Sequence, residues 1–124
     1  MNTILIRADA NSEIGTGHVM RMIGLAQGII RAGGEAYLVT YECPPTLIDR
    51  IISAGIQWRS GEKYLMGSIT DARNTKKIAQ QVNADWLVTD GYHFDLAYQL
   101  EVKEAGLKLA CVCLLYTSPS PRDA

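Results

Sequence analysis

The sequence predicts an α/β protein: a Rossmann-like parallel sheet with helices on both faces. Apolar segments rich in β-formers alternate along the chain with segments of helical periodicity, and glycine or proline follows most of them. This alternation favours right-handed β-α-β crossovers, which leave chiefly doubly wound topologies. A chain of 124 residues is long enough for one domain with a real core.

The first half of the chain predicts two strands and two helices. Residues 3–8 form an apolar first strand. Residues 17–32 predict a helix that ends at two glycines, because these apolar residues recur at helical spacing: Val19, Ile23, Ala26 and Ile30. Residues 36–41 are rich in β-formers and predict the second strand. Residues 45–53 predict a helix that opens at a proline.

The second half repeats the same alternation. Residues 56–59 predict a short third strand, and residues 69–82 predict a helix with apolar residues on one face. Residues 86–89 form a buried fourth strand before an Asp-Gly turn. Residues 94–105 predict a helix closed by glycine, and residues 108–112 begin a fifth strand.

Composition limits which partners and which cellular compartment we expect for the protein. A net charge of −1 gives no reason to expect nucleic acid or an anionic membrane. No apolar run reaches the roughly 18 residues of a membrane helix. Arg7 and Asp9 interrupt the early apolar segment, so we expect no signal peptide and a cytoplasmic protein. The cysteines form no C-x-x-C pair and are expected to be reduced.

The segment after the first strand carries the strongest chemical signal. Gly15 and Gly17 stand one residue apart, with Thr16 between them, and His18 follows at once. A glycine-rich turn into a helix lets backbone N–H groups approach an anion, which the helix dipole also favours. The same dipole disfavours an imidazolium at the first turn. A neutral His18 there can act as a general base, or it can simply cap the helix.

The doubly wound order predicts which loops share a crevice with His18. Ligands bind where the strand order reverses, between the first and fourth strands, so residues 9–18 should face residues 90–93. Asp9 or another acid could orient the His18 ring; Asp9 could also bind a sugar hydroxyl or accept backbone N–H bonds. Arg21 lies on the face of His18 and could hold a phosphate or form an ordinary surface ion pair.

Other residues near the predicted crevice bear on which ligand it binds. Glu42 ends the second strand, where dinucleotide enzymes place a ribose-binding acid. However, Met20 replaces the third glycine of G-x-G-x-x-G, so a nicotinamide site is disfavoured. Asp90-Gly91 could be no more than a turn, and Tyr92 could bind substrate or cover the end of the sheet.

At these residues the chain resembles a known family. Residues 7–9 and 14–21 look like the opening of the PseG family, and residues 85–92 are similar to that family's segment after the fourth strand. PseG proteins are UDP-2,4-diacetamido-2,4,6-trideoxy-β-L-altropyranose hydrolases of pseudaminic acid synthesis. The resemblance spans residues 1–112 and implies the N-terminal part of a two-domain fold of the GT-B type.

The resemblance also implies a reaction and roles for single residues. Water would attack the anomeric carbon and UDP would leave with inversion, without a metal or another cofactor. His18 would activate the water, Gly15 and Gly17 would shape the loop beside the diphosphate, and Tyr92 would lie near the sugar. The predicted substrate site comprises these residues: Asp9, Gly15, Thr16, Gly17, Arg21 and Tyr92.

The end of the chain departs from the pattern. Residues 113–123 read Cys-Leu-Leu-Tyr-Thr-Ser-Pro-Ser-Pro-Arg-Asp and resemble a translated sequencing adapter. We therefore expect residues 1–112 to be an incomplete N-terminal domain and residues 113–124 to be a non-native tail. The uridine-binding half would then be missing and the fragment inactive. Two other functions remain open: a GT-B glycosyltransferase, and a non-catalytic nucleotide- or partner-binding α/β domain.

Overall fold

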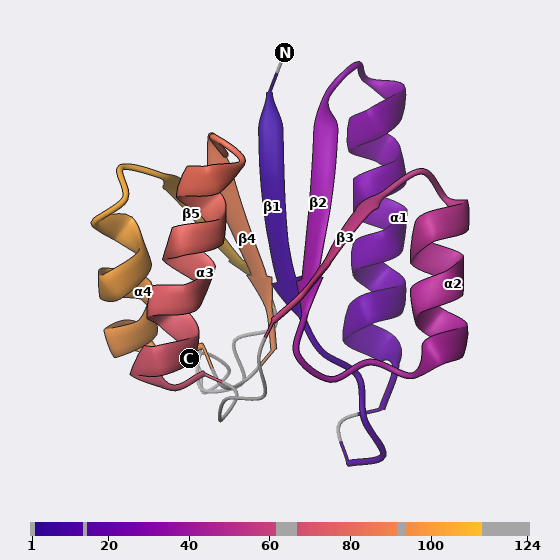
Figure 1. The fold of residues 1–124 in the computed structure, drawn as a ribbon, viewed down its shortest axis with the longest axis horizontal. Helices are drawn as coiled ribbons and strands as arrows, with labels where there is room; N and C mark the ends of the chain where they lie inside the picture. Colours follow the sequence, from indigo (N-terminus) through magenta and orange to yellow (C-terminus); the bar gives the residue numbers. More distant parts are fainter. Residues whose placement is uncertain (1, 14, 62–66, 92–93, 113–124) are drawn as a thin grey trace, which may run out of the picture.

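The computed structural model describes residues 2–13, 15–61, 67–91 and 94–112. Strands and helices alternate along all of this length (Figure 1). The elements are β1 (Thr3–Ala8), α1 (Gly17–Arg31), β2 (Glu35–Thr40), α2 (Pro45–Ser53), β3 (Gln57–Ser60), α3 (Ile69–Gln81), β4 (Trp86–Asp90), α4 (Leu96–Lys103) and β5 (Lys108–Val112). The predicted α/β class is confirmed.

The sheet is parallel and has the doubly wound strand order. Its strands lie in the order β3-β2-β1-β4-β5. The central strand β1 pairs with β2 on one side and with β4 on the other, with Ile6 opposite both Leu38 and Val88. The chain winds outward through β2 and β3 and then crosses back to β4. The strand order therefore reverses between β1 and β4, as the sequence predicts.

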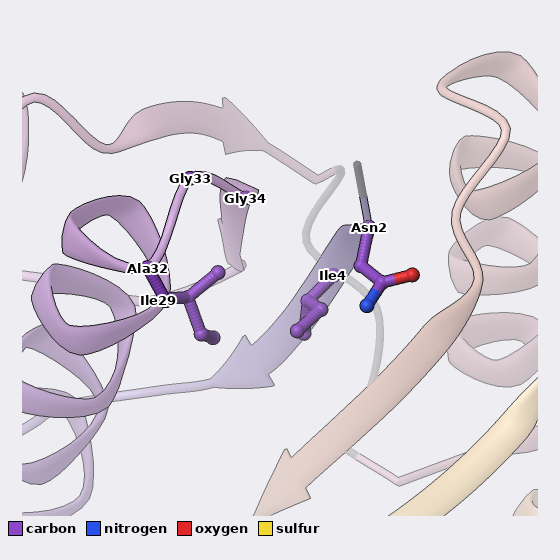
Figure 2. Close-up of a pocket in the computed structure, with 6 residues that line it drawn as sticks. All are labelled: Asn2, Ile4, Ile29, Ala32, Gly33 and Gly34. Atoms are coloured by element: carbon purple, nitrogen blue, oxygen red, sulfur yellow. The ribbon is translucent and has the colours of Figure 1, made fainter.

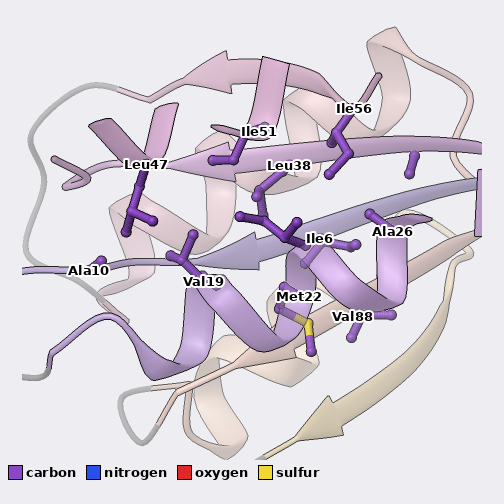
Figure 3. Close-up of a cluster of buried hydrophobic side chains, with 13 residues drawn as sticks. Ile6, Ala10, Val19, Met22, Ala26, Leu38, Leu47, Ile51, Ile56 and Val88 are labelled. Carbon is purple, nitrogen blue, oxygen red and sulfur yellow. The ribbon is translucent and has the colours of Figure 1, made fainter. Parts of the chain in front are cut away.

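The helices cover the two faces of the sheet in pairs. Helices α1 and α2 lie on one face, and α3 and α4 lie on the other (Figure 1). Beneath α1 and α2 the core is aliphatic and fully enclosed (Figure 3); it includes Ile6, Ala8, Val19, Met22, Ala26, Leu38 and Ile51. The core beneath α3 and α4 is more aromatic and includes Leu5, Val39, Tyr41, Leu87, Phe94 and Tyr98.

Side-chain alternation along β1 assigns its residues to these two faces. Ile6 and Ala8 pack beneath α1, whereas Leu5 packs beneath α3 and α4. Arg7 follows Leu5 on the second face, because successive side chains of a strand point to opposite sides. The side chains of Arg7 and Asp9 therefore point away from α1.

The predicted boundaries hold for most elements and fail for α4. The bounds of β1, α2 and β5 match the prediction, and α1 and α3 end one residue earlier than expected. Helix α4 begins at Leu96 instead of residue 94, because the Asp95 side chain accepts the backbone N–H of Tyr98 at 3.0 Å and caps the helix. Phe94 lies before this cap as a buried core residue.

Candidate active site

His18 stands in the first turn of α1, at the carboxyl end of β1, and is 8% exposed. Its Nδ1 lies 2.8 Å from Oδ1 of Asp90, the last residue of β4. The structure thus brings together a histidine and a carboxylate from the two strands between which the order reverses. This is the edge where open parallel sheets bind their ligands.

Arg21 joins this pair from the next turn of α1. Its Nε donates to Asp90 Oδ2 at 2.8 Å and its Nη2 donates to Asp90 Oδ1 at 2.7 Å. The same Nη2 lies 3.3 Å from His18 Nδ1. The Asp90 carboxylate is fully buried, while the Arg21 side chain is 49% exposed. A fork of two parallel hydrogen bonds fixes the plane of the carboxylate.

Asp90 is the residue whose contribution the sequence analysis missed. The sequence predicts that the loop after β4 faces His18, yet it leaves Asp90-Gly91 as a possible turn. The available signal was an acidic residue at the carboxyl end of a buried strand, directly across the reversal point from the histidine. Tyr92, which the resemblance implies for the sugar, lies outside the described residues.

Asp9 does not contact His18, because it lies on the other face of the sheet. Its Oδ1 accepts the backbone N–H groups of Tyr41 at 2.6 Å and Glu42 at 3.0 Å. Its Oδ2 lies 2.8 Å from Arg7 Nη1, with no hydrogen bond to it among the described residues. In this arrangement Asp9 accepts backbone hydrogen bonds and ties the start of the loop after β2 to the end of β1.

Arg7 is the centre of a second charged cluster, which is fully buried. Besides Asp9, it meets Asp71 of α3, with Nε to Oδ1 at 3.1 Å and Nη2 to Oδ2 at 2.9 Å. Its guanidinium lies 3.9 Å from the centre of the Tyr41 ring. Burial opposes the charge of Arg7, but the Asp9 and Asp71 carboxylates raise its pKa above the ordinary value.

The glycine loop leaves open space above the start of α1. Gly15 adopts a left-handed φ of 74°, and its N–H donates to the carbonyl of Asn11 at 2.8 Å, which closes a tight turn. Apart from its own chain neighbours and nearby helix backbone, a Cβ placed on Gly15 or Gly17 would meet no atom of the described residues within 4 Å. Thr16 precedes the helix, but its side chain makes no capping hydrogen bond. Thr16 therefore does not cap the first turn of α1 through its side chain.

A cavity of about 250 Å³ lies at the opposite end of the sheet (Figure 2). It is bounded by Ile4 of β1, Ile29 of α1, the Gly33-Gly34 turn and Asn2. None of the described residues that line it has a titratable side chain.

A larger cavity of about 350 Å³ opens at the carboxyl ends of β1 and β2. Asn11 and Glu42 line it and are joined by a hydrogen bond of 3.0 Å. Cys43 also lines it, and burial, together with the charge of Asp9, raises the pKa of this thiol to about 11. Cys43 is therefore protonated and a poor nucleophile at neutral pH.

The described residues contain neither a candidate metal site nor a candidate membrane span. No three His, Cys, Asp or Glu side chains in that part of the chain come together as ligands for a metal ion. No helix there is long and apolar enough to cross a bilayer.

Comparison with known proteins shows the fold. No family model and no curated protein sequence matches the chain. Among solved structures, the chain is similar to a glycosyltransferase from Rickettsia africae, with a TM-score of 0.69 and 17% identity over 89% of this chain and 29% of the other. It is also similar to MurG from Acinetobacter baumannii, with a TM-score of 0.64 and 13% identity over 90% and 34%.

A third similar structure is about as long as this chain. The universal stress protein from Archaeoglobus fulgidus matches with a TM-score of 0.54 and 15% identity, over 91% of this chain and 94% of its own. The chain thus spans about a third of each glycosyltransferase and nearly all of the stress protein. At these identities the likenesses show a Rossmann-like α/β fold.

Proposed function

We propose that residues 1–112 are the sugar-side half of an enzyme that hydrolyses a nucleotide sugar, with His18 as its general base. One observation carries the proposal: His18 is fixed by Asp90 at the reversal point of the sheet, in the first turn of α1. A buried histidine with a carboxylate partner is a common arrangement for accepting a proton. The resemblance to the PseG family supplies the substrate class.

In the proposed reaction, His18 removes a proton from water while the water oxygen bonds to the anomeric carbon. The bond between that carbon and the phosphate oxygen breaks, and UDP leaves with the electron pair. The N-terminus of α1 lies on the same edge of the sheet as His18, and its dipole stabilises negative charge that develops on a diphosphate. The proposed substrate is UDP-2,4-diacetamido-2,4,6-trideoxy-β-L-altropyranose.

Gly15, Thr16 and Gly17 would border the diphosphate in this scheme, since the space around both glycines is open. Arg21 is half-exposed one turn away and would face the rim of the cleft. Asp9 would act indirectly, by holding the loop after β2 in place. Tyr92 remains a substrate-binding residue proposed from the resemblance alone.

Transfer of the sugar to an acceptor is the second candidate function. It is favoured by the similarity to two glycosyltransferases, each about three times as long as this chain. The same base would then deprotonate an acceptor hydroxyl. The two reactions differ in product, because hydrolysis releases free sugar without an acceptor.

The test uses the protein encoded by the uninterrupted gene that contains residues 1–112. With the UDP-sugar and no acceptor, we expect UDP and free sugar in equal amounts. His18→Gln should lower kcat by about 10²- to 10⁴-fold, as expected when a general base is lost. Glu101→Gln, in an ion pair between α3 and α4, is the control. Turnover only with an acceptor, or an active His18→Gln enzyme, would overturn the proposal.

A further inference from the structure

We propose that Asp90, whose carboxylate is held by Arg21, is a positioning residue that selects one neutral tautomer of His18, the form with its proton on Nδ1. In that tautomer Nε2 carries the lone pair, so Nε2 is the nitrogen able to accept a proton. The benefit for catalysis rests on the proposed function. The tautomer itself is a property of the described chain and is measured without any substrate.

The distance between His18 Nδ1 and Asp90 Oδ1 requires a proton between them. Both atoms would be acceptors if Nδ1 were bare, and two lone pairs facing each other at 2.8 Å repel. With the proton on Nδ1, the same distance is a charge-assisted hydrogen bond of ordinary length. The short contact therefore favours the Nδ1–H form.

Arg21 offers the competing arrangement, in which its Nη2 donates to a bare Nδ1. That contact is 3.3 Å, whereas the same Nη2 lies 2.7 Å from Asp90 Oδ1. The carboxylate is thus the better placed acceptor for Nη2. Because Arg21 and the Nδ1–H group both donate, Asp90 must act as acceptor toward each of them, as an ionised carboxylate does.

The backbone fixes this arrangement. Asp90 pairs with Ala8 in the ladder between β4 and β1, in the middle of the sheet. The side chain of Asp90 is fully buried and that of His18 is 10% exposed, so water competes little for their hydrogen bond. The ring orientation follows from a strand that cannot shift without breaking the sheet.

The ring lies between two groups of opposite charge. From β4 the ring meets the negative Asp90, and from α1 it meets the positive Arg21. Asp90 thereby selects the nitrogen that carries the proton, and Arg21 holds the plane of the Asp90 carboxylate.

The experiment measures the ¹⁵N shifts of the His18 ring in the 124-residue chain. His93→Gln removes the other histidine of the sequence, so the remaining ring signals belong to His18. Above neutral pH we expect a protonated-type shift at Nδ1 and a bare-type shift at Nε2. A ring that is mainly Nε2–H in this background overturns the proposal, and this result needs no variant of the cluster.

Two further substitutions test the separate roles. In Asp90→Asn the amide can donate to Nδ1, so the ratio of Nδ1–H to Nε2–H rings should fall about tenfold, as one charge-assisted hydrogen bond is lost. In Arg21→Gln the Nδ1–H tautomer should persist, because the Asp90 carboxylate still accepts from Nδ1. Glu101→Gln, which also replaces a paired carboxylate by an amide, should leave the ratio of the two tautomers unchanged.

The outcomes separate this proposal from the proposed function. An unchanged tautomer ratio in a folded Asp90→Asn chain overturns the positioning role, whatever reaction the protein catalyses. If Asp90→Asn does not fold, the starting tautomer and Arg21→Gln decide the question. A longer enzyme that hydrolyses no nucleotide sugar would end the proposed function and leave the tautomer measurement standing.

Discussion

At the scale of single residues, two buried clusters of charge lie on opposite faces of the same sheet. Asp90 binds His18 and Arg21 on the face beneath α1. Arg7 forms ion pairs with Asp9 and Asp71 on the face beneath α3 and α4. Arg21 of the first cluster is half-exposed, whereas the three side chains of the second cluster are fully buried. The second cluster is enclosed and serves the fold.

Arg7→Met should be strongly destabilising, because it leaves the Asp9 and Asp71 carboxylates buried without their cation. Breaking a buried ion pair in this way costs about 3–5 kcal/mol. Urea unfolding, followed by circular dichroism, measures the loss.

Arg73→Gln is the matched control for Arg7→Met. Arg73 pairs with Glu101 at 3.8 Å and its side chain is 68% exposed. Loss of such a surface pair should cost under about 1 kcal/mol. Equal losses in the two variants would contradict the structural role of the Arg7 cluster.

Which residues meet at the site was only partly predictable. Periodicity along β1 places Arg7 and Asp9 on one face, and the topology places the loops after β1 and β4 at one edge. Neither pattern tells which face α1 covers, and that choice decides between Asp9 and Asp90 as the partner of His18. The pairing therefore depends on tertiary packing that no local pattern encodes.

At the scale of elements, α3 links its own start to the Arg7 cluster. The Ser68 side chain accepts the backbone N–H of Asp71 at 3.2 Å and caps the helix. The Asp71 carboxylate accepts from Thr75 and from Tyr98 of α4, as well as from Arg7. One residue of the first turn thus joins β1, α3 and α4.

Ser68→Ala should destabilise the protein by about 1 kcal/mol, the usual cost of losing a side-chain cap. The variant also frees the turn that positions Asp71. The free energy of unfolding in urea is the measurement. Ser68→Thr keeps the hydroxyl and should recover most of the loss, and a failure to recover it would show that the cap is not the cause.

The elements themselves were the most predictable level. Apolar periodicity fixes a strand or a helix wherever the segment is long, and glycine marks its end, as at Gly33 with a φ of 93°. The error at α4 arose because Phe94 continues the apolar pattern, although its side chain belongs to the core and Asp95 starts the helix. The apolar pattern and the capping residue thus predict different starts for the same helix, and the cap decides.

At the scale of the whole molecule, the strand order explains why the two strands that carry the site are neighbours. Right-handed crossovers and the reversal between β1 and β4 bring residues 18 and 90 together although they are far apart in sequence. This much of the architecture follows from the alternation of elements. The substrate does not, because many chemistries share this fold.

The 124-residue chain alone should release no UDP from the UDP-sugar above the buffer rate, and it should bind UDP weakly by calorimetry. Under the proposed function the uridine-binding half would belong to a further domain, and the chain spans only about a third of the glycosyltransferases it resembles in fold. A protein from the uninterrupted gene should be active. Comparable turnover by the short chain would contradict the two-domain proposal.

The contact between Asp9 and the loop after β2 affects which substitutions this loop tolerates. Both donors to Asp9 Oδ1 are main-chain N–H groups, those of residues 41 and 42. The main chain at this point is therefore held without help from the side chain at position 42, although the Glu42 carboxylate also accepts from Asn11. Evolution or an engineer can replace Glu42 to alter what the cavity presents to a ligand, while the loop keeps its path.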